Sequence, residues 1–370
     1  MDTTPQFHGS DLEKISEYYG IPKDSIVRFG ANVNPLGLSE KIKASICQNL
    51  DIISSYPDRE YAALRHAIGE YCQASPSHVI VGNGSTELIS LLIEQKMPKK
   101  TLILGPTYSE YDRELSFIDS IRDYYILSPD RGFHLDLYDF LEKLKERYDL
   151  LIICNPNNPT SSAIPSEQMG QILRACREAG TFVMIDETYV EFTPDIQRVT
   201  AIPLAKEFSN FIVLRGVSKF FAAPGLRLGY GVTSDQSFLD LVRSRQIPWS
   251  LNSIAAFAGE EMFKDTDYIR RTRALVQEQR AGMLRELRRL PNITVYEAAA
   301  NFILIQIHPP GPKASALFQH CIRQGLMIRD CSSFQYLEGE YVRFCIMEPS
   351  DNARLLAALK ECLPPVPTQP

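Results

Sequence analysis

The sequence predicts an α/β fold with a mostly parallel central sheet, helices on both faces of that sheet, and a smaller α+β domain. Three observations support this prediction. Between about residues 79 and 232, short apolar runs without polar alternation are separated by helical patterns, as in a parallel sheet buried on both faces. Beyond about residue 266, short strands and helices mix without that order. The chain has 370 residues, which is long for a single simple core.

The first part of the chain is expected to be mainly helical. An amphipathic pattern over 11–19 ends at Gly20, a residue that commonly caps the end of a helix. A strand is expected over 26–29, followed by a loop of turn-forming residues. Helical patterns then cover 39–50 and 61–72.

The central part alternates strands and helices. Polar and glycine-rich residues repeatedly follow the strand runs, and ligands of parallel sheets bind beyond the carboxyl ends of the strands. Any single loop of this kind is explained by the need to connect two elements, but five loops with site-like residues favour a functional site. The expected strands cover 79–81, 102–104, 150–154, 182–185, 211–214 and 228–232.

The last part changes character after two long helices. We expect four domain segments: an N-terminal segment over 1–50 that completes the small domain and the active site, a large cofactor-binding domain over 51–265, a small α+β domain over 266–363, and a disordered Pro-rich tail over 364–370. The expected helices cover 253–263, 268–290, 314–324 and 351–362, and the expected strands cover 294–296, 302–307, 327–329 and 341–346.

Composition excludes several classes of function. The 39 basic and 45 acidic residues give a net charge of −6, so no overall positive field attracts nucleic acid or an anionic membrane. The eight cysteines form no C-x-x-C pair, which argues against a metal site or a disulfide framework and favours a reducing cytoplasm. No signal peptide and no run long enough to span a bilayer is evident. We therefore expect a cytoplasmic protein without a metal, nucleic acid or membrane as partner.

The stretch 215–227 places a lysine and an arginine directly after a strand-like run. Lys219 follows Ser218, and Arg227 lies after a Pro-Gly pair. A lysine on a tight connection after a buried strand is desolvated, which lowers its pKa and makes its amine a nucleophile. An arginine beside it offers a fixed fork for a phosphate. Taken alone, a polar surface loop explains the stretch equally well, so the other loops have to distinguish the two interpretations.

Other strand ends carry groups that complement such a lysine. Asp186 ends an apolar run and, as a buried carboxylate, needs a cationic partner, although a structural cap also explains it. Residues 84–86 (G-S-T) at a helix start offer backbone donors to a phosphate, although glycine turns before helices are common. Tyr108 is placed to stack on an aromatic ring. Pyridoxal 5'-phosphate (PLP) requires a lysine, a carboxylate and an anion cradle together, so we predict that the chain binds this cofactor.

The order of the motifs carries a family resemblance. N-N-P-T at 157–160, D-E-x-Y at 186–189, S-K at 218–219 and G-L-R at 225–227 follow one another along the chain. With these motifs the chain resembles the fold-type I PLP enzymes, in the branch shared by histidinol-phosphate aminotransferases and threonine-phosphate decarboxylases of cobalamin biosynthesis. The resemblance covers nearly the whole chain and implies a fold-type I aminotransferase-like fold.

The resemblance implies a role for each matching residue. Lys219 would bind the cofactor's aldehyde, and Asp186 would pair with the ring nitrogen. Asn158 and Tyr189 would hydrogen-bond the ring hydroxyl, while Tyr108 would stack on the ring. A tyrosine of the neighbouring subunit would also reach the phosphate, which implies a homodimer with a shared active site. The expected phosphate ligands are Gly84, Ser85, Thr86, Ser218, Arg227 and, from the neighbouring subunit, Tyr56.

The reaction depends on residues far from the lysine in sequence. The family pattern implies that His8, Asn32 and Arg329 bind the substrate phosphate. Arg343 would bind the substrate carboxylate, and two separate cationic forks suit a small doubly anionic substrate. A loosely ordered terminus, a turn and strand-edge ion pairs are the alternative explanations of these residues. The stretches that resemble the decarboxylase cover 8–9, 29–37, 248–252 and 328–331.

The resemblance therefore implies decarboxylation of O-phospho-L-threonine to (R)-1-aminopropan-2-yl phosphate for cobamide nucleotide-loop synthesis, with O-phosphoserine as a further candidate substrate. The alternative is a histidinol-phosphate-type aminotransferase. A non-catalytic regulator would need a fused DNA-binding module, for which the chain has no room. Three departures from the family pattern weaken the distinction between the decarboxylase and the aminotransferase. Gly216 stands where relatives usually carry a hydroxyl, Tyr189 has the aminotransferase form, and Ser10 stands where a second glycine is usual.

Overall fold

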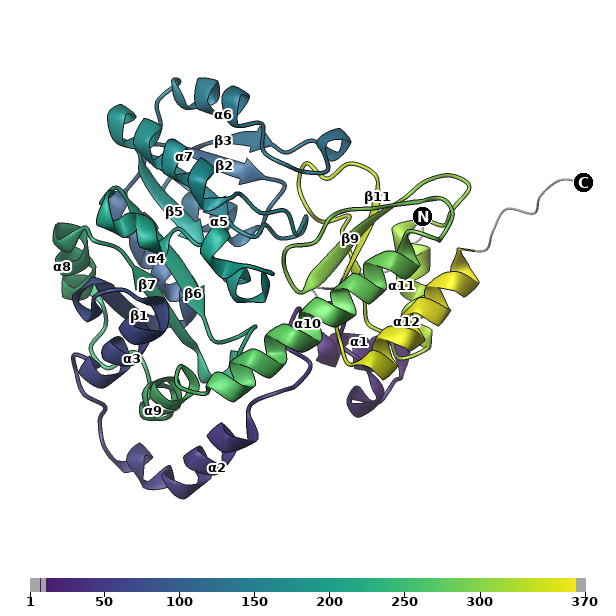
Figure 1. The fold of residues 1–370 in the computed structure, drawn as a ribbon, viewed down its shortest axis with the longest axis horizontal. Coiled ribbons are helices and arrows are strands. Elements are labelled where there is room, and N and C mark those ends of the chain that lie inside the picture. The colour runs from purple at the N-terminus through teal and green to yellow at the C-terminus, as the bar shows by residue number, and fades with distance from the viewer. Residues whose placement is uncertain (1–6, 8–10, 364–370) are drawn as a thin grey trace, which may run out of the picture.

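The structure, a computed structural model, describes Phe7 and residues 11–363. It confirms the predicted α/β architecture, with a seven-stranded sheet and a separate four-stranded sheet (Figure 1). The expectations for His8, Ser10 and the tail over 364–370 lie outside the described residues. Within the described part of the chain, no helix is long and apolar enough to cross a membrane.

The large sheet has the strand order β1-β7-β6-β5-β4-β2-β3 and is parallel except at β7, which runs antiparallel to both of its neighbours. β6 and β7 are joined by a connection too short for a crossover helix, so β7 has to return in the opposite direction. The strands are β1 (Val79–Asn83), β2 (Lys100–Gly105), β3 (Ile121–Ile126), β4 (Leu150–Cys154), β5 (Phe182–Asp186), β6 (Phe211–Gly216) and β7 (Leu228–Val232).

Side chains of the inner strands alternate between two buried cores. Leu151 and Ile153 of β4 face one core, and Leu150 and Ile152 face the other. Helices α4, α5 and α8 contribute to the second core, and helices α3, α6, α7 and α9 contribute to the first. The helices are α3 (Ala62–Cys72), α4 (Gly84–Lys96), α5 (Glu110–Ser116), α6 (Leu137–Leu144), α7 (Ser166–Ala179), α8 (Gln236–Arg245) and α9 (Ser253–Met262).

The small sheet is antiparallel throughout, with the order β10-β11-β9-β8. One of its faces packs with α1, α11 and α12 in a third apolar core. Its elements are β8 (Ile293–Val295), β9 (Phe302–Ile307), β10 (Arg329–Asp330), β11 (Glu340–Cys345), α1 (Leu12–Tyr19), α11 (Ala314–Arg323) and α12 (Pro349–Cys362).

Helix α10 (Thr266–Leu287) runs from the large sheet to the small one (Figure 1). Val276 packs in a core of the large sheet, whereas Leu287 packs in the core of the small sheet. The N-terminal segment is divided in the same way, because Ile15 lies in the small-sheet core and Ile42 of α2 (Glu40–Gln48) lies in a large-sheet core. The division into 1–50, 51–265 and 266–363 remains a proposal.

Two expected strands differ from the structure. The segment over 26–29 forms no strand, because Val27 makes only an isolated bridge to Leu326. The strand expected over 327–329 begins later, at Arg329, where pairing with β11 starts. Sequence reasoning also missed β3, an edge strand whose polar sequence (IRDYYI) and partial exposure hide the apolar pattern of the inner strands.

Candidate active site

A cavity of about 470 Å³ is lined by loops that follow strands of the large sheet, by the segment over 30–32 and by residues of the small domain. Its position at the carboxyl ends of the parallel strands is the one expected for this class of sheet. Thirteen of the predicted site residues line it. They are Asn32, Gly84, Ser85, Thr86, Tyr108, Asn158, Asp186, Tyr189, Ser218, Lys219, Arg227, Arg329 and Arg343.

Asp186 ends β5 and is held from both sides of its carboxylate. Its Oδ1 accepts hydrogen bonds from the Thr188 backbone N (2.9 Å) and Oγ1 (2.6 Å). Its Oδ2 accepts from the Tyr111 Oη (2.6 Å). Sequence reasoning missed both donors: Thr188 follows two residues later in the same turn, but Tyr111 comes from α5 and no local pattern marks it. These bonds stabilise a buried carboxylate that faces the cavity.

Lys219 lies on the connection after β6, with its Nζ donating a hydrogen bond to the Ala31 carbonyl at 2.8 Å. Burial, followed by the positive charge of Arg343, lowers the pKa of the amine to about 8. An amine with that pKa is neutral in a substantial fraction of molecules near neutral pH and is therefore a competent nucleophile. The activated-amine interpretation of this stretch is thus the one that the geometry favours over a surface loop.

The start of α4 and the side chain of Arg227 lie against each other. Gly84 has a φ of +82°, and a Cβ at this position would lie 2.3 Å from the Arg227 Nη2. A Cβ on Gly229 of β7 would lie 2.2 Å from the Ser85 backbone N, so β7 also approaches the helix start closely. The N-terminus of a helix carries free N–H groups and a positive partial charge. Together with Arg227, it forms a cradle for an anion.

Aromatic and amide groups form another part of the cavity wall. Burial raises the pKa of Tyr108 to about 12, and its ring meets the Tyr111 ring edge-on at 5.6 Å. Tyr189 is buried, and its Oη accepts a 3.4 Å hydrogen bond from the Asn32 amide. The Asn158 amide oxygen accepts a hydrogen bond from Arg343. Tyr189 and Asn158 therefore each contact one of the four predicted substrate-binding side chains.

Two arginines face the cavity from neighbouring strands of the small sheet. Arg329 of β10 and Arg343 of β11 are directly opposite each other in the ladder. Arg343 is 5% exposed and donates to an amide oxygen and to the Gly30 carbonyl (2.9 Å). Its buried Nε has no hydrogen-bond partner within the part of the chain that the structure describes. Arg329 donates to the Ser333 Oγ at 2.7 Å. Like charges at opposed positions are unfavourable unless an anion lies between them, so this pair is suited to an anionic ligand.

Asn32 is the third polar group of this region. It is 1% exposed and has a φ of 57°, a left-handed conformation that asparagine tolerates better than most residues. Its buried Oδ1 has no hydrogen-bond partner among the described residues. A buried polar atom without a partner is costly, so a ligand donor at this point would complete the site.

Tyr56 is the predicted site residue that lies away from the cavity. Its side chain is 81% exposed, and its ring is 4.9 Å from the Trp249 ring. Within one subunit it does not line the cavity. This placement leaves its expected contact with a neighbouring subunit as a proposal.

Comparison with known proteins assigns the chain to a family. The sequence model of the Aminotransferase class I and II family matches residues 24–359. The chain belongs to the aminotransferase class I and II family. The resemblance inferred from the sequence motifs is thereby confirmed, as is PLP as the cofactor of a PLP-dependent enzyme.

Relatives with two different activities match this family member over almost its whole length. The chain is 33% identical to a threonine-phosphate decarboxylase of Salmonella typhimurium, covering 96% of each protein. It is 31% identical to a histidinol-phosphate aminotransferase of Methanopyrus kandleri, covering 98% of this chain and 95% of the relative. Among solved structures, the histidinol-phosphate aminotransferase of Clostridium acetobutylicum matches with a TM-score of 0.84 and 30% identity, covering 90% of this chain and 98% of that one.

The L-threonine-O-3-phosphate decarboxylase of Porphyromonas gingivalis matches with a TM-score of 0.78 and 23% identity, covering 90% of this chain and 98% of that one. This similarity is one of fold. The cavity residues themselves fit PLP, because a hydrogen-bonded carboxylate, a lysine of lowered pKa and an anion cradle that only glycine permits all line one cavity.

Proposed function

We propose that the protein decarboxylates O-phospho-L-threonine to (R)-1-aminopropan-2-yl phosphate for cobamide nucleotide-loop synthesis. The observation that carries this proposal is the opposition of Arg329 and Arg343 on neighbouring strands at the cavity that also contains Lys219. Two arginine forks suit a substrate with a phosphate and a carboxylate, and the proposal agrees with the name of the Salmonella relative.

We propose the cofactor contacts as follows. The segment over 51–265 provides Lys219 for the aldehyde and Asp186 for the ring nitrogen. Tyr108 stacks on the ring, and Asn158 with Tyr189 hydrogen-bonds the ring hydroxyl. The proposed phosphate ligands are Gly84, Ser85, Thr86, Ser218, Arg227 and Tyr56 of a second copy.

The proposed reaction uses the chain's own residues for binding, orientation and proton transfer. When bound, PLP supplies a conjugated sink for the electron pair left on Cα after an α-bond breaks. Arg329, Asn32 and His8 hold the substrate phosphate. Arg343 would hold the carboxylate and so orient the substrate for breakage of the bond from Cα to the carboxylate carbon.

Carbon dioxide then leaves, and the electron pair on Cα takes up a proton. The Nζ of Lys219 is the proposed donor of that proton because it is the buried amine of the cavity, with a pKa of about 8. The same nitrogen would instead remove the α-hydrogen if the substrate were oriented for breakage of the bond from Cα to hydrogen. The orientation imposed by Arg343 therefore distinguishes decarboxylation from transamination.

We propose a homodimer in the cytoplasm. Tyr56 is exposed and its ring contacts that of the exposed Trp249, as expected for side chains covered by a second copy. Arg59 also lies over the Trp249 ring, with its Cζ atom 5.7 Å from the ring centroid. The exposed apolar side chains on the two sequence segments that carry Tyr56 and Trp249 are Leu50, Ile53, Tyr56, Ile247 and Trp249.

Two alternatives have specific support. O-Phosphoserine differs from the proposed substrate by one methyl group, which an apolar contact discriminates by only about 1–3 kcal/mol. A histidinol-phosphate-type aminotransferase is favoured by Tyr189 and by the relative from Methanopyrus kandleri.

One experiment separates the two reactions. The purified, PLP-loaded protein is incubated with O-phospho-L-threonine in the absence of any 2-oxo acid. The amounts of carbon dioxide and of the phosphorylated amine are then both measured and compared. The proposal predicts equal amounts of both products. Arg329→Ala should weaken substrate binding, whereas Arg323→Ala, on the exposed face of α11, should not. No gas, together with acceptor-dependent loss of histidinol phosphate, would contradict the decarboxylase.

A further inference from the structure

Directly after Asp186, a buried ion pair joins the ends of two strands outside the cavity. Glu187 is 0% exposed at its side chain and Arg215 is 2% exposed. The Oε2 of Glu187 accepts hydrogen bonds from the Arg215 Nε (3.0 Å) and Nη2 (2.7 Å). Neither side chain lines the cavity, so a direct contact with cofactor or substrate does not explain the pair.

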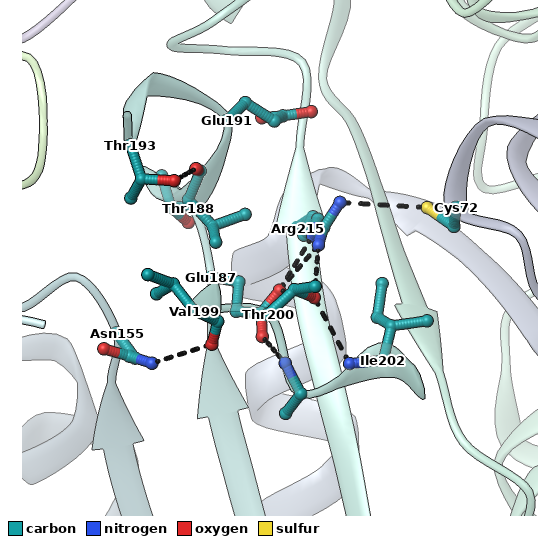
Figure 2. A network of polar contacts seen from close by, with 12 residues as sticks. Cys72, Asn155, Glu187, Thr188, Glu191, Thr193, Val199, Thr200, Ile202 and Arg215 are labelled. Atoms are coloured by element: carbon teal, nitrogen blue, oxygen red, sulfur yellow. Dashed lines mark hydrogen bonds and ion pairs between the residues drawn. The ribbon is translucent and has the colours of Figure 1, made fainter. Parts of the chain in front are cut away.

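The charged groups of the pair also make hydrogen bonds to neighbouring residues, as Figure 2 shows. Thr200 donates to the Glu187 Oε2 at 2.9 Å and accepts from the Arg215 Nη2 at 2.7 Å. The Glu187 Oε1 accepts from the Ala201 backbone N at 2.6 Å. Cys72 of α3 lies 3.9 Å from the Arg215 Nη1. The pair therefore connects β5, β6, α3 and the segment over 200–201 at one point.

The pair lies close in sequence to Asp186 and Lys219, the two central groups of the site. In the ladder, Asp186 of β5 is opposite Leu214 of β6, and the Glu187 backbone N donates to the Leu214 carbonyl at 2.8 Å. Glu187 is the residue after Asp186, and Arg215 precedes Lys219 by four positions. A shift of one strand end against the other would change the placement of the Asp186 carboxylate relative to the Lys219 amine.

Stability alone is a poor explanation of this pair. Taking two charges out of water costs free energy, and well-packed apolar residues of similar volume often replace a buried ion pair without loss of stability. An ion pair with a planar guanidinium does, however, fix direction and register in a way that apolar contacts do not.

We propose that Glu187 and Arg215 are positioning residues that fix the placement of Asp186 relative to Lys219. This inference rests on the proposed roles of Asp186 at the ring nitrogen and of Lys219 at the aldehyde. It does not depend on which substrate is used or which α-bond breaks.

The decisive variant is Glu187→Met/Arg215→Met, since removal of one partner alone would leave a buried charge without its counter-charge. The pH midpoint of the visible absorption band is measured on the PLP-loaded protein without substrate. Arg343, Arg227 and Cys345, which lie near the Lys219 amine, are unchanged in this variant. We expect the midpoint to move by about 0.5 pH unit or more. We also expect kcat to fall by about tenfold or more, with a smaller change in KM.

A control variant of lowered stability distinguishes a changed placement of Asp186 relative to Lys219 from a general loss of stability. Leu173→Ala removes a fully buried side chain of α7 and should lower the melting temperature without moving the band. Glu187→Asp, which keeps the carboxylate, should move the midpoint less than the double variant does. The proposal is overturned if the double variant keeps the parent midpoint, or if Leu173→Ala moves the band equally. If the double variant does not fold, Glu187→Gln is judged by the same comparison with Leu173→Ala.

The test also separates this inference from the proposed function. A decarboxylase that releases carbon dioxide but shows no band shift in the double variant would retain its function and lose the positioning pair. A protein that releases no carbon dioxide but shows the shift would lose the proposed reaction and keep the pair.

Discussion

The Nζ of Lys219 donates a 2.8 Å hydrogen bond to the backbone carbonyl of Ala31, a residue 188 positions earlier in the chain. The segment that holds this carbonyl also carries Asn32 and the Gly30 carbonyl, which accepts from Arg343. The lysine and two predicted substrate-binding side chains, Asn32 and Arg343, thus meet at one short segment near the N-terminus. The amine is buried there, and this burial is the main cause of its lowered pKa.

The first prediction concerns the pH dependence of cofactor capture. The neutral amine is the nucleophile, and its pKa is lowered from 10.5 to about 8, so its reactive fraction rises with pH around that value. The rate at which the apoprotein takes up PLP should therefore increase from pH 6 and level off above about pH 8. Stopped-flow absorbance measures this rate. Lys219→Ala should abolish the absorbance that borohydride fixes, whereas Lys206→Ala on the surface should retain it.

The second prediction concerns the support of Asp186. Tyr111→Phe keeps the ring but removes the hydroxyl that donates to Asp186 Oδ2 at 2.6 Å. A hydrogen bond to a charged group contributes about 1.5–3 kcal/mol, so kcat should fall by about 10-fold to 100-fold. Tyr138→Phe, at a side chain that is 78% exposed, is the matched control. Equal kcat values in the two variants would refute the role of the Tyr111 hydroxyl.

The third prediction concerns Gly84 at the anion cradle. Gly84→Ala places a Cβ against Arg227 at a φ of +82°, which should cost about 1–3 kcal/mol and weaken PLP binding. The control is Gly282→Ala in α10, where a Cβ meets nothing within 4 Å. That change should stabilise the helix by about 0.5–1 kcal/mol. Urea unfolding and PLP titration of both variants test the prediction, and a Gly84→Ala protein with parent affinity would contradict it.

The fourth prediction concerns Gly216, a position where the family resemblance implies a residue with a hydroxyl group. A Cβ at this position would lie 3.3 Å from the Leu228 carbonyl and 3.9 Å from the Ser85 Oγ, so a serine side chain is tight but close to the cradle. Gly216→Ser should tighten PLP binding by about 2-fold to 10-fold through one added hydrogen bond. Gly216→Ala separates the hydroxyl from the packing change. If both variants bind PLP equally, the added hydroxyl makes no phosphate contact.

The fifth prediction concerns Glu191, a buried carboxylate near Arg215. Burial raises its pKa from 4.5 to about 6. The folded state therefore holds this proton more tightly than the unfolded state, and the group lowers stability increasingly as pH rises from about 4.5 to 6. Glu191→Gln should raise the free energy of unfolding by about 2 kcal/mol at pH 8 and by less at pH 5. Urea unfolding at both pH values measures this difference. Glu17→Gln on the surface is the control, and an equal gain at both pH values would refute the assignment.

Much of the fold was predictable because buried parallel strands have a strong local pattern. The apolar runs over 150–154 and 228–232 coincide with β4 and β7, and 302–307 coincides with β9. β3 was missed because an edge strand needs no continuous apolar run. The segment over 26–29 was predicted as a strand because of its apolar residues. These residues do pack in a core, but the backbone makes only an isolated bridge instead of a strand.

The identity of the cofactor was already readable in the sequence. Lys219, Asp186 and the turn at Gly84 each follow or end a buried strand, and the carboxyl ends of parallel strands meet at one edge of a sheet. Local patterns and chain order were therefore sufficient to predict that these residues share a site.

The contacts between distant segments came from the folded chain. Arg329 opposite Arg343, Tyr111 on Asp186, Ala31 on Lys219 and Glu187 on Arg215 each join different elements. Such contacts depend on how helices and strands pack in three dimensions, and local propensity carries no information about that packing. The sequence identified groups that line one cavity, and tertiary packing set the partners that orient them.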